Sequence, residues 1–123
     1  MIASSVTGAT SYWWKFFVAD GSSVQENLGF DFATNRVYSG LSVPLDYKVF
    51  VAMVADSSGT AVGGGTNRYR FYLWDGSGWQ TASGTQFLPI RLQGLEIGSF
   101  NGGTRPFDGR IDDLRIYDRS WPI

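Results

Sequence analysis

The sequence predicts an all-β protein in which many short strands are joined by glycine-containing turns. Its 123 residues include 16 glycines, which favour turns, and 5 tryptophans, 6 tyrosines and 9 phenylalanines, which favour strands. The three longest stretches without glycine or proline are residues 9–20, 45–58 and 110–121, and none shows the i, i+3, i+4, i+7 spacing of an amphipathic helix. Helix is therefore expected to be a minor element.

The chain is long enough for one domain with a sizeable core, and we expect residues 1–123 to form it. A chain of 13.6 kDa buries about two thirds of its surface on folding. Residues 57–67, SSGTAVGGGTN, have the composition of a linker. A domain boundary there would leave two halves of about 60 residues that each bury little surface, so a long loop is the favoured interpretation.

The first third of the chain contains a strand followed by a hairpin. Residues 12–18, YWWKFFV, are rich in aromatic and β-branched side chains and end just before a turn signal, DG. Residues 27–32 alternate between apolar and polar with a period of two, and residues 33–36 turn the chain into 37–39. This pattern predicts a strand at 12–18 and a half-exposed hairpin after it.

The middle of the chain contains two strands of different character. Residues 49–55, VFVAMVA, are apolar throughout, which predicts a central strand covered on both faces. Residues 68–74 alternate, with Tyr69, Phe71 and Leu73 on one face and Arg70, Tyr72 and Trp74 on the other. A tight turn at residues 75–78, DGSG, then leads to Trp79. The rings expected in the core from strand parity are Phe16, Phe30, Phe32, Phe50, Tyr69 and Phe71.

The last two strand patterns are residues 92–97 and 110–117, separated by the turn-rich residues 99–109. Within the final pattern, Ile111 and Leu114 have opposite parity. Both can face one core only if the register slips, so the sequence predicts a β-bulge near Asp112 and Asp113.

Composition excludes several classes of function. With no histidine and no cysteine, the chain lacks the base of a Ser-His dyad, a thiolate nucleophile, a disulfide and the usual ligands of structural zinc. A net charge of -1 and a pI of about 5.2 remove the electrostatic attraction that drives nucleic-acid binding. No apolar run approaches the roughly 18 residues of a membrane span, and residues 1–11 lack the pattern of a signal peptide, so we expect neither.

The carboxylates of the sequence do not suggest a catalytic pair either. Glycoside hydrolysis needs two carboxyl groups on either side of the scissile bond, and the only glutamates are Glu26 and Glu96. Asp112 and Asp113 are adjacent, so on a regular strand they would point to opposite faces. We expect them to form hydrogen bonds at the bulge and to pair with Arg110 or Arg115. The sequence therefore predicts a protein that is not an enzyme.

The most informative candidates for binding are aromatic. Trp74 and Trp79 flank the turn at residues 75–78, and Tyr72 and Arg70 share the face of Trp74. Large outward rings can stack on the apolar face of a sugar while neighbouring polar groups form hydrogen bonds with it. The full set of candidate ligand-binding residues is Arg70, Tyr72, Trp74, Asp75, Trp79, Asn101 and Arg105. The alternative is that the same rings cover the second sheet or form a subunit contact, where Trp and Tyr are also enriched.

A metal site is a further candidate. Calcium prefers six to eight oxygen ligands that converge from loops, and Asp75 and Asp108 provide loop carboxylates. No EF-hand pattern accompanies them, so ordinary turn hydrogen bonding is the favoured interpretation.

The C-terminal part of the chain contains LEIG at residues 95–98, NGG at 101–103 and FDGRIDDLRIYDR at 107–119. Together these segments resemble the closing motif of laminin-G-like domains in the concanavalin A-like lectin/glucanase superfamily, with weaker matches at 47–56 and 72–76. It implies a jelly-roll sandwich of two antiparallel sheets, located extracellularly or at a surface, that binds carbohydrate or protein, in some members with calcium. Catalytic members of the superfamily carry a Glu-x-Asp-x-Glu motif or a close variant, which this sequence lacks.

Domains of this kind usually run longer and open with a strand that pairs beside the closing one. Because residues 12–18 look like a later strand, the resemblance implies a minimal domain or one that lacks an N-terminal strand. An uncovered sheet edge is a template for pairing, which makes homo-oligomerisation a further hypothesis. The predicted function is a non-catalytic module that binds glycans or glycoproteins, and the alternative is a structural or assembly module of a surface or virion protein.

Overall fold

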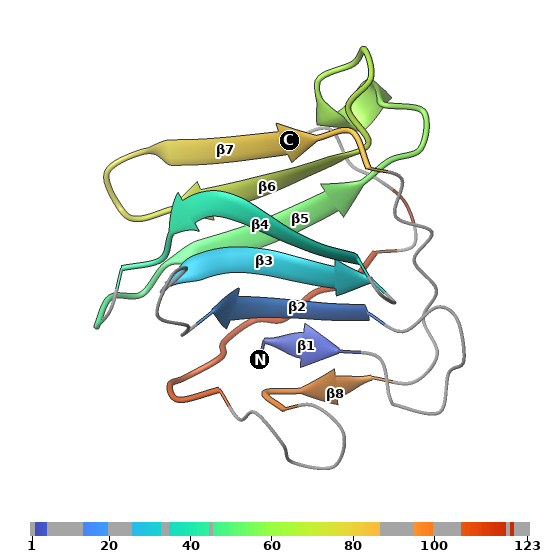
Figure 1. The fold of residues 1–123 in the computed structure, drawn as a ribbon. Coiled ribbons are helices and arrows are strands. Elements are labelled where there is room, and N and C mark those ends of the chain that lie inside the picture. Colours follow the sequence, from blue (N-terminus) through green and yellow to red (C-terminus); the bar gives the residue numbers. More distant parts are fainter. Residues whose placement is uncertain are drawn as a thin grey trace.

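The computed structural model describes residues 2–4, 14–19, 26–32, 35–44, 46–86, 95–99, 107–117 and 119, and it contains two antiparallel sheets (Figure 1). The five-stranded sheet has the order β4-β3-β2-β1-β8 and consists of β1 (Ala3–Ser4), β2 (Trp14–Ala19), β3 (Asn27–Phe32), β4 (Asn35–Ser42) and β8 (Glu96–Ile97). The three-stranded sheet has the order β5-β6-β7 and consists of β5 (Phe50–Ala55), β6 (Tyr69–Trp74) and β7 (Trp79–Gly84). Among the described residues the only helix is the 3-10 turn η1 (Thr60–Val62), so the all-β prediction is confirmed.

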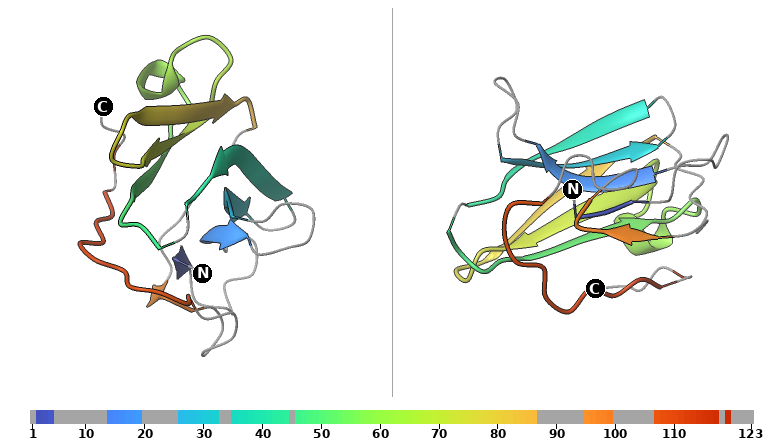
Figure 2. Two further views of the ribbon diagram at one scale, coloured as in Figure 1. Left: turned by 90° about the vertical axis from the view of Figure 1, so that its left-hand side faces the viewer. Right: turned by 90° about the horizontal axis from the view of Figure 1, so that it is seen from below.

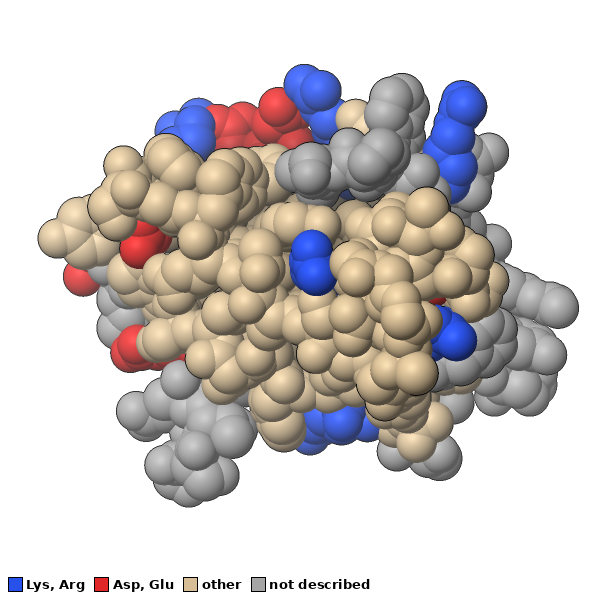
Figure 3. Space-filling view, turned by 90° about the horizontal axis from the view of Figure 1, so that it is seen from above, with Lys and Arg blue, Asp and Glu red and all other residues tan. Residues whose placement is uncertain are grey.

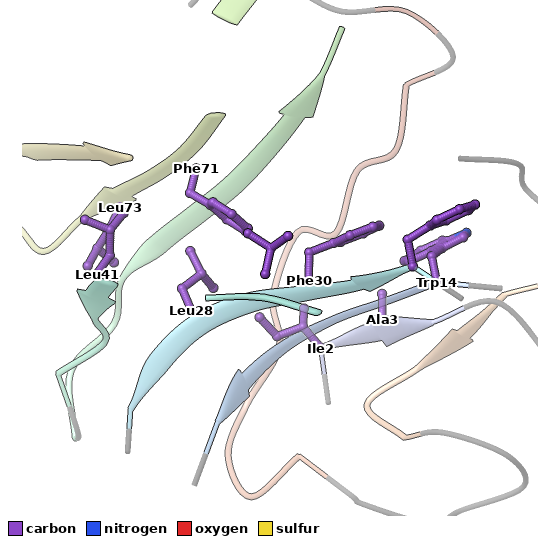
Figure 4. Close-up of a cluster of buried hydrophobic side chains, with 10 residues drawn as sticks. Ile2, Ala3, Trp14, Leu28, Phe30, Leu41, Phe71 and Leu73 are labelled. Atoms are coloured by element: carbon purple, nitrogen blue, oxygen red, sulfur yellow. The ribbon is translucent and has the colours of Figure 1, made fainter. Parts of the chain in front are cut away.

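The two sheets face each other across one apolar core (Figures 2 and 4). Its buried members are Ile2, Ala3, Trp14, Leu28, Phe30, Phe32, Val37 and Leu41 from the five-stranded side, and Phe71 and Leu73 from β6. On one side of the sandwich β4 contacts β7. On the other side, residues 107–117 run from beside β8 toward the three-stranded sheet, and Phe107 and Leu114 pack against the core (Figure 2).

The predicted strand at 12–18 is present as β2, although residues 12 and 13 lie outside the described part of the chain. The predicted hairpin is present as β3 and β4, which pair from Phe30↔Val37 to Phe32↔Asn35 and shift register between Asn27 and Gly29.

The prediction that this hairpin is half exposed is wrong for β3. β4 alternates between buried and exposed residues, but β3 is buried from Leu28 to Phe32. Long side chains of the neighbouring strands cover its outer face.

Two contacts cover the outer face of β3. The Phe17 ring lies over Gly29, where an added Cβ would be 2.7 Å from the ring. Asp31 lies between Lys15, whose Nζ is 3.8 Å from Oδ2, and Arg36, whose Nε is 2.6 Å from Oδ1.

The prediction that residues 49–55 form a central strand covered on both faces is also wrong. β5 is an edge strand, and its residues are exposed or half-buried. Val51 and Met53 pack inward against the core, whereas Phe50 points outward and contacts the ring of Trp79. The continuous apolar run therefore reflects an apolar outer surface and not a second layer of protein.

The C-terminal strand prediction does not hold either. Residues 110–117 are in no strand, and Asp113 has a left-handed backbone with φ of 54°. The segment is held by side chains: Leu114 packs on the core, and Lys48 Nζ lies 3.2 Å from Asp112 Oδ2. The expected pairing of Asp113 with Arg115 is present, with Nε 2.9 Å from Oδ1. Because no ladder runs through this segment, the β-bulge is absent, and Asp112 pairs with Lys48 and not with Arg110.

The five-stranded sheet joins a strand from the start of the described chain with one that forms more than 90 residues later. Ala3 of β1 pairs with Phe16 of β2 on one side and with Ile97 of β8 on the other. A short N-terminal strand thus lies beside β8, the last strand among the described residues, which corrects the alternative that such a strand is missing. Of the pattern predicted at 92–97, residues 95–97 are described, and Glu96–Ile97 forms a strand; residues 92–94 lie outside the described part of the chain.

Candidate functional site

The strongest candidate site is the outward surface of the three-stranded sheet, which we call the outer face. Inward-pointing Phe71 and Leu73 are fully buried, so the alternate residues of each strand point away from the core. The strand register places these outward residues in three rows: Phe50, Trp74 and Trp79; Ala52, Tyr72 and Thr81; Val54, Arg70 and Ser83. Figure 3, which views the molecule from the side of β7, shows a largely uncharged surface with charged groups mainly toward its margins.

An aromatic cluster occupies one end of the outer face, with Trp79 at its centre. Its ring lies 5.6 Å from that of Phe50 and 6.3 Å from that of Tyr72, both edge to face, and 5.3 Å from that of Trp74 in a tilted arrangement. The Trp79 side chain covers Tyr72, which is only 6% exposed, while Trp79 itself remains 52% exposed. Aromatic neighbours at these separations hold one another in place, so the cluster presents a preformed platform to solvent.

The prediction that Phe50 belongs to the core is wrong, because it points outward into this cluster. The other rings assigned to the core are placed as expected: Phe30, Phe32 and Phe71 are buried, and Phe16 and Tyr69 pack against them. Trp74 and Trp79 are both exposed, so neither covers the second sheet. Of the alternatives for these two rings, contact with a ligand and contact with another protein remain.

A shallow cavity of about 310 Å³ lies beside the cluster and is lined by Arg70, Tyr72, Trp79 and Thr81. Its volume is at the lower end of the range for small-molecule sites. Three of the four lining residues are predicted site residues, and Thr81 is an addition. Thr81 could be found only from the pairing of β6 with β7, which places it opposite Tyr72.

Arg70 is held at the edge of this cavity. Its Nε donates a hydrogen bond of 2.7 Å to Oγ of Ser83, the residue directly opposite on β7. Its Nη2 lies against Gly63 in the 57–67 loop, at a place where an added Cβ would collide with it. Gly63 also has a positive φ of 96°, so both the backbone and the close contact favour glycine.

The 57–67 loop that supports Arg70 is ordered by Asp56. The Asp56 carboxylate accepts hydrogen bonds from the Ser58 N–H (2.9 Å) and hydroxyl (2.7 Å) and from the Ala61 N–H (2.8 Å). These bonds lower the pKa of Asp56, with the Ala61 N–H as the largest cause. Val62 is fully buried, which ties the predicted long loop to the rest of the domain.

Asp75 shapes the turn between β6 and β7. Its Oδ1 accepts hydrogen bonds from the Ser77 hydroxyl (2.6 Å), the Ser77 N–H (2.9 Å) and the Gly78 N–H (3.2 Å), and its Oδ2 accepts one from Gln80 (3.1 Å). The Ser77 hydroxyl is the main cause that lowers the pKa of Asp75 to about 2. Asp75 therefore organises the hairpin that carries Trp74 and Trp79, which agrees with the turn interpretation of its sequence.

The remaining candidates do not join this site. Asp108 is exposed in the 107–117 segment, and Asn101 and Arg105 lie outside the described residues. In the described part of the chain, no three Asp, Glu, His or Cys side chains gather closely enough to hold a metal ion. The described residues also contain no helix long and apolar enough to cross a membrane.

Comparison with protein-family models, with curated proteins and with solved structures finds no match for this chain. The outer face is therefore the basis for assigning a function.

Proposed function

We propose that the chain is a non-catalytic carbohydrate-binding module that holds a glycan or the glycan of a glycoprotein on the outer face. The observation that carries this proposal is the joint lining of one cavity by Trp79, Arg70 and Thr81, beside an exposed aromatic platform. The apolar face of a sugar ring stacks on an aromatic ring, and the hydroxyl and guanidinium groups beside it form directional hydrogen bonds. None of the four residues that line the cavity is a carboxylate, whereas glycoside hydrolysis needs two.

In this binding mechanism, the two ends of the cavity contribute affinity and selectivity respectively. Ring stacking on Trp79, extended by Trp74, supplies affinity. Thr81 and Arg70 supply selectivity, since their hydrogen bonds require sugar oxygens at matching positions. The shallow shape limits the area that a glycan buries, so a single site binds with a Kd of roughly 10 μM to 1 mM.

The proposal includes the jelly-roll connectivity of laminin-G-like domains. It is supported by the two facing antiparallel sheets and by the position of β1 beside β8. It is also supported by the motif at residues 107–119. An extracellular or surface-associated location follows from this relationship.

The second candidate is an assembly module that uses the same surface as a protein interface. The exposure of Phe50, Trp74 and Trp79 on one sheet favours it, because aromatic residues are enriched at the cores of interfaces. In this case the mass of the protein in solution rises with concentration, and Trp79→Ala prevents the rise.

A glycan array tests the primary proposal, run with calcium and with a chelator. We expect binding in both conditions, because the cavity lining contains no carboxylate. Trp79→Ala should weaken binding by about tenfold or more, which corresponds to the loss of roughly 1.4 kcal/mol of stacking. The matched control is Tyr47→Ala, which removes an exposed ring outside the outer face and should leave binding unchanged. A blank array on folded protein, or equal binding by Trp79→Ala, would overturn the proposal.

A further inference from the structure

We infer that the bound glycan is acidic and that Arg70 binds its negatively charged group, a carboxylate or a sulfate; this inference rests on the proposed function. Arg70 is the only charged residue among the nine that form the outer face. It lines the same cavity as Trp79, so a ligand that fills this cavity contacts both residues.

Arg70 differs in its partners from Arg36 and Arg115, two of the other arginines in the described chain. Arg36 and Arg115 each form two hydrogen bonds with a carboxylate, to Asp31 and Asp113 respectively. Arg70 instead forms one hydrogen bond, to the neutral hydroxyl of Ser83. No carboxylate of the described residues lies within ion-pair distance of it.

The guanidinium is also oriented before a ligand arrives. Its Nε is engaged by Ser83, and its Nη2 lies against the backbone at Gly63. Within the described residues, the two terminal nitrogens form no hydrogen bond. A planar guanidinium held in this way is suited to bind a carboxylate or sulfate through two parallel hydrogen bonds.

The spacing along the sheet indicates the size of the glycan. Trp79 and Ser83 are four residues apart on β7, which corresponds to about 13 Å along the strand. Stacking at one end and charge recognition near the other therefore favour an oligosaccharide over a single sugar. The chain carries a net charge of -1, so an acidic glycan gains no attraction from the protein as a whole, and its recognition depends on this local cation.

The test compares glycans that differ only in charge. The probes are an oligogalacturonide with its methyl-esterified form, and a sulfated oligosaccharide with its desulfated form, each titrated into the protein by calorimetry. The wild-type protein should bind one acidic probe about tenfold to a hundredfold more tightly than its neutral counterpart. The pair that shows the difference identifies the anion as a carboxylate or a sulfate.

Variants of Arg70 then separate charge recognition from stacking. Arg70→Gln should bind the acidic and neutral probes equally, while Arg70→Lys should recover only part of the preference because an ammonium cannot form the two parallel bonds. Trp79→Ala should weaken the binding of the acidic and the neutral probe by the same factor, and Tyr47→Ala should change the affinity for neither.

The outcomes distinguish the two proposals. If the acidic and neutral probes bind equally and Arg70→Gln has no effect, the inference is overturned while carbohydrate binding stands. If no probe binds and the glycan array is blank, both are overturned. If Arg70→Gln abolishes the preference in a protein that melts at the wild-type temperature, the inference is supported.

Discussion

Replacing Asp31 with asparagine is expected to destabilise the protein, since this carboxylate lies between two cations on the outer side of the five-stranded sheet. The Asp31 side chain is only 4% exposed. Arg36 binds both of its oxygens, with Nε–Oδ1 at 2.6 Å and Nη2–Oδ2 at 2.7 Å, and Lys15 Nζ lies 3.8 Å from Oδ2. The hydrogen bonding that Arg36 donates to Asp31 is the main cause that raises the pKa of Arg36. In Asp31→Asn both cations lose the negative charge of this carboxylate.

The loss in the free energy of unfolding is estimated from the burial of the ion pair. Removing one partner of a buried ion pair costs about 3–5 kcal/mol, because the remaining charge stays out of water. Arg36 is 48% exposed, so solvent screens its interaction with Asp31. The expected loss of stability is therefore at the lower end of this range, about 3 kcal/mol. A chain of 123 residues has a net stability of roughly 6–18 kcal/mol, so the loss is a large fraction of the whole.

Urea unfolding followed by tryptophan fluorescence measures this loss, since Trp14 lies in the core. With a slope of about 2 kcal/mol per molar urea, the midpoint should fall by roughly 1.5 M. The matched control is Asp112→Asn, which breaks the exposed pair with Lys48 and should lower the midpoint by about 0.5 M at most. If the urea midpoint of Asp31→Asn also fell by no more than about 0.5 M, the reasoning would be refuted.

Two further predictions concern the three-stranded sheet. The folded-state pKa of Asp75 is about 2, below its ordinary value of 3.8, so the stability it contributes is present above about pH 4 and is lost as the pH falls through 2. The melting temperature of Asp75→Asn should therefore differ less between about pH 5 and pH 2 than that of the wild-type protein. An equal difference in the two proteins would contradict the turn geometry. Gly84→Ala should cost about 1–3 kcal/mol in chemical unfolding, because its Cβ would collide with the Tyr69 phenol, whereas Gly78→Ala has open space and should cost much less. Equal losses for the two alanine variants would mean that Tyr69 does not lie over Gly84.

Where neighbouring residues decide the structure, the sequence predicted it well. The alternation at residues 68–74 and the DGSG turn place Arg70, Tyr72 and Trp74 on one face beside Trp79, as the structure has them. In a hairpin, side-chain parity and a short turn are enough to specify which residues share a face.

Features that depend on distant pairing could not be predicted in the same way. An apolar run such as residues 49–55 looks the same whether its second face lies under protein or forms an exposed apolar surface, so the pattern predicts a core position for Phe50 although the residue is exposed. Residues 110–117 have the composition of a strand but form no ladder, and composition does not reveal whether a partner strand is present. The pairing of Asp31 with Lys15 and Arg36 depends on the register of three strands, which no local pattern of the sequence expresses.

The position of β1 between β2 and β8 has a consequence for how the protein folds. The three-stranded sheet consists of strands joined in chain order, so its contacts are fairly local. The five-stranded sheet, in contrast, brings together segments that are far apart in the chain. Ser4 and Ser99, for example, are 95 residues apart and are joined by a hydrogen bond. Contacts at such separation slow folding, because the chain must close a long loop before they form. During synthesis the edge of β1 therefore stays open to pairing with other chains until β8 has been made.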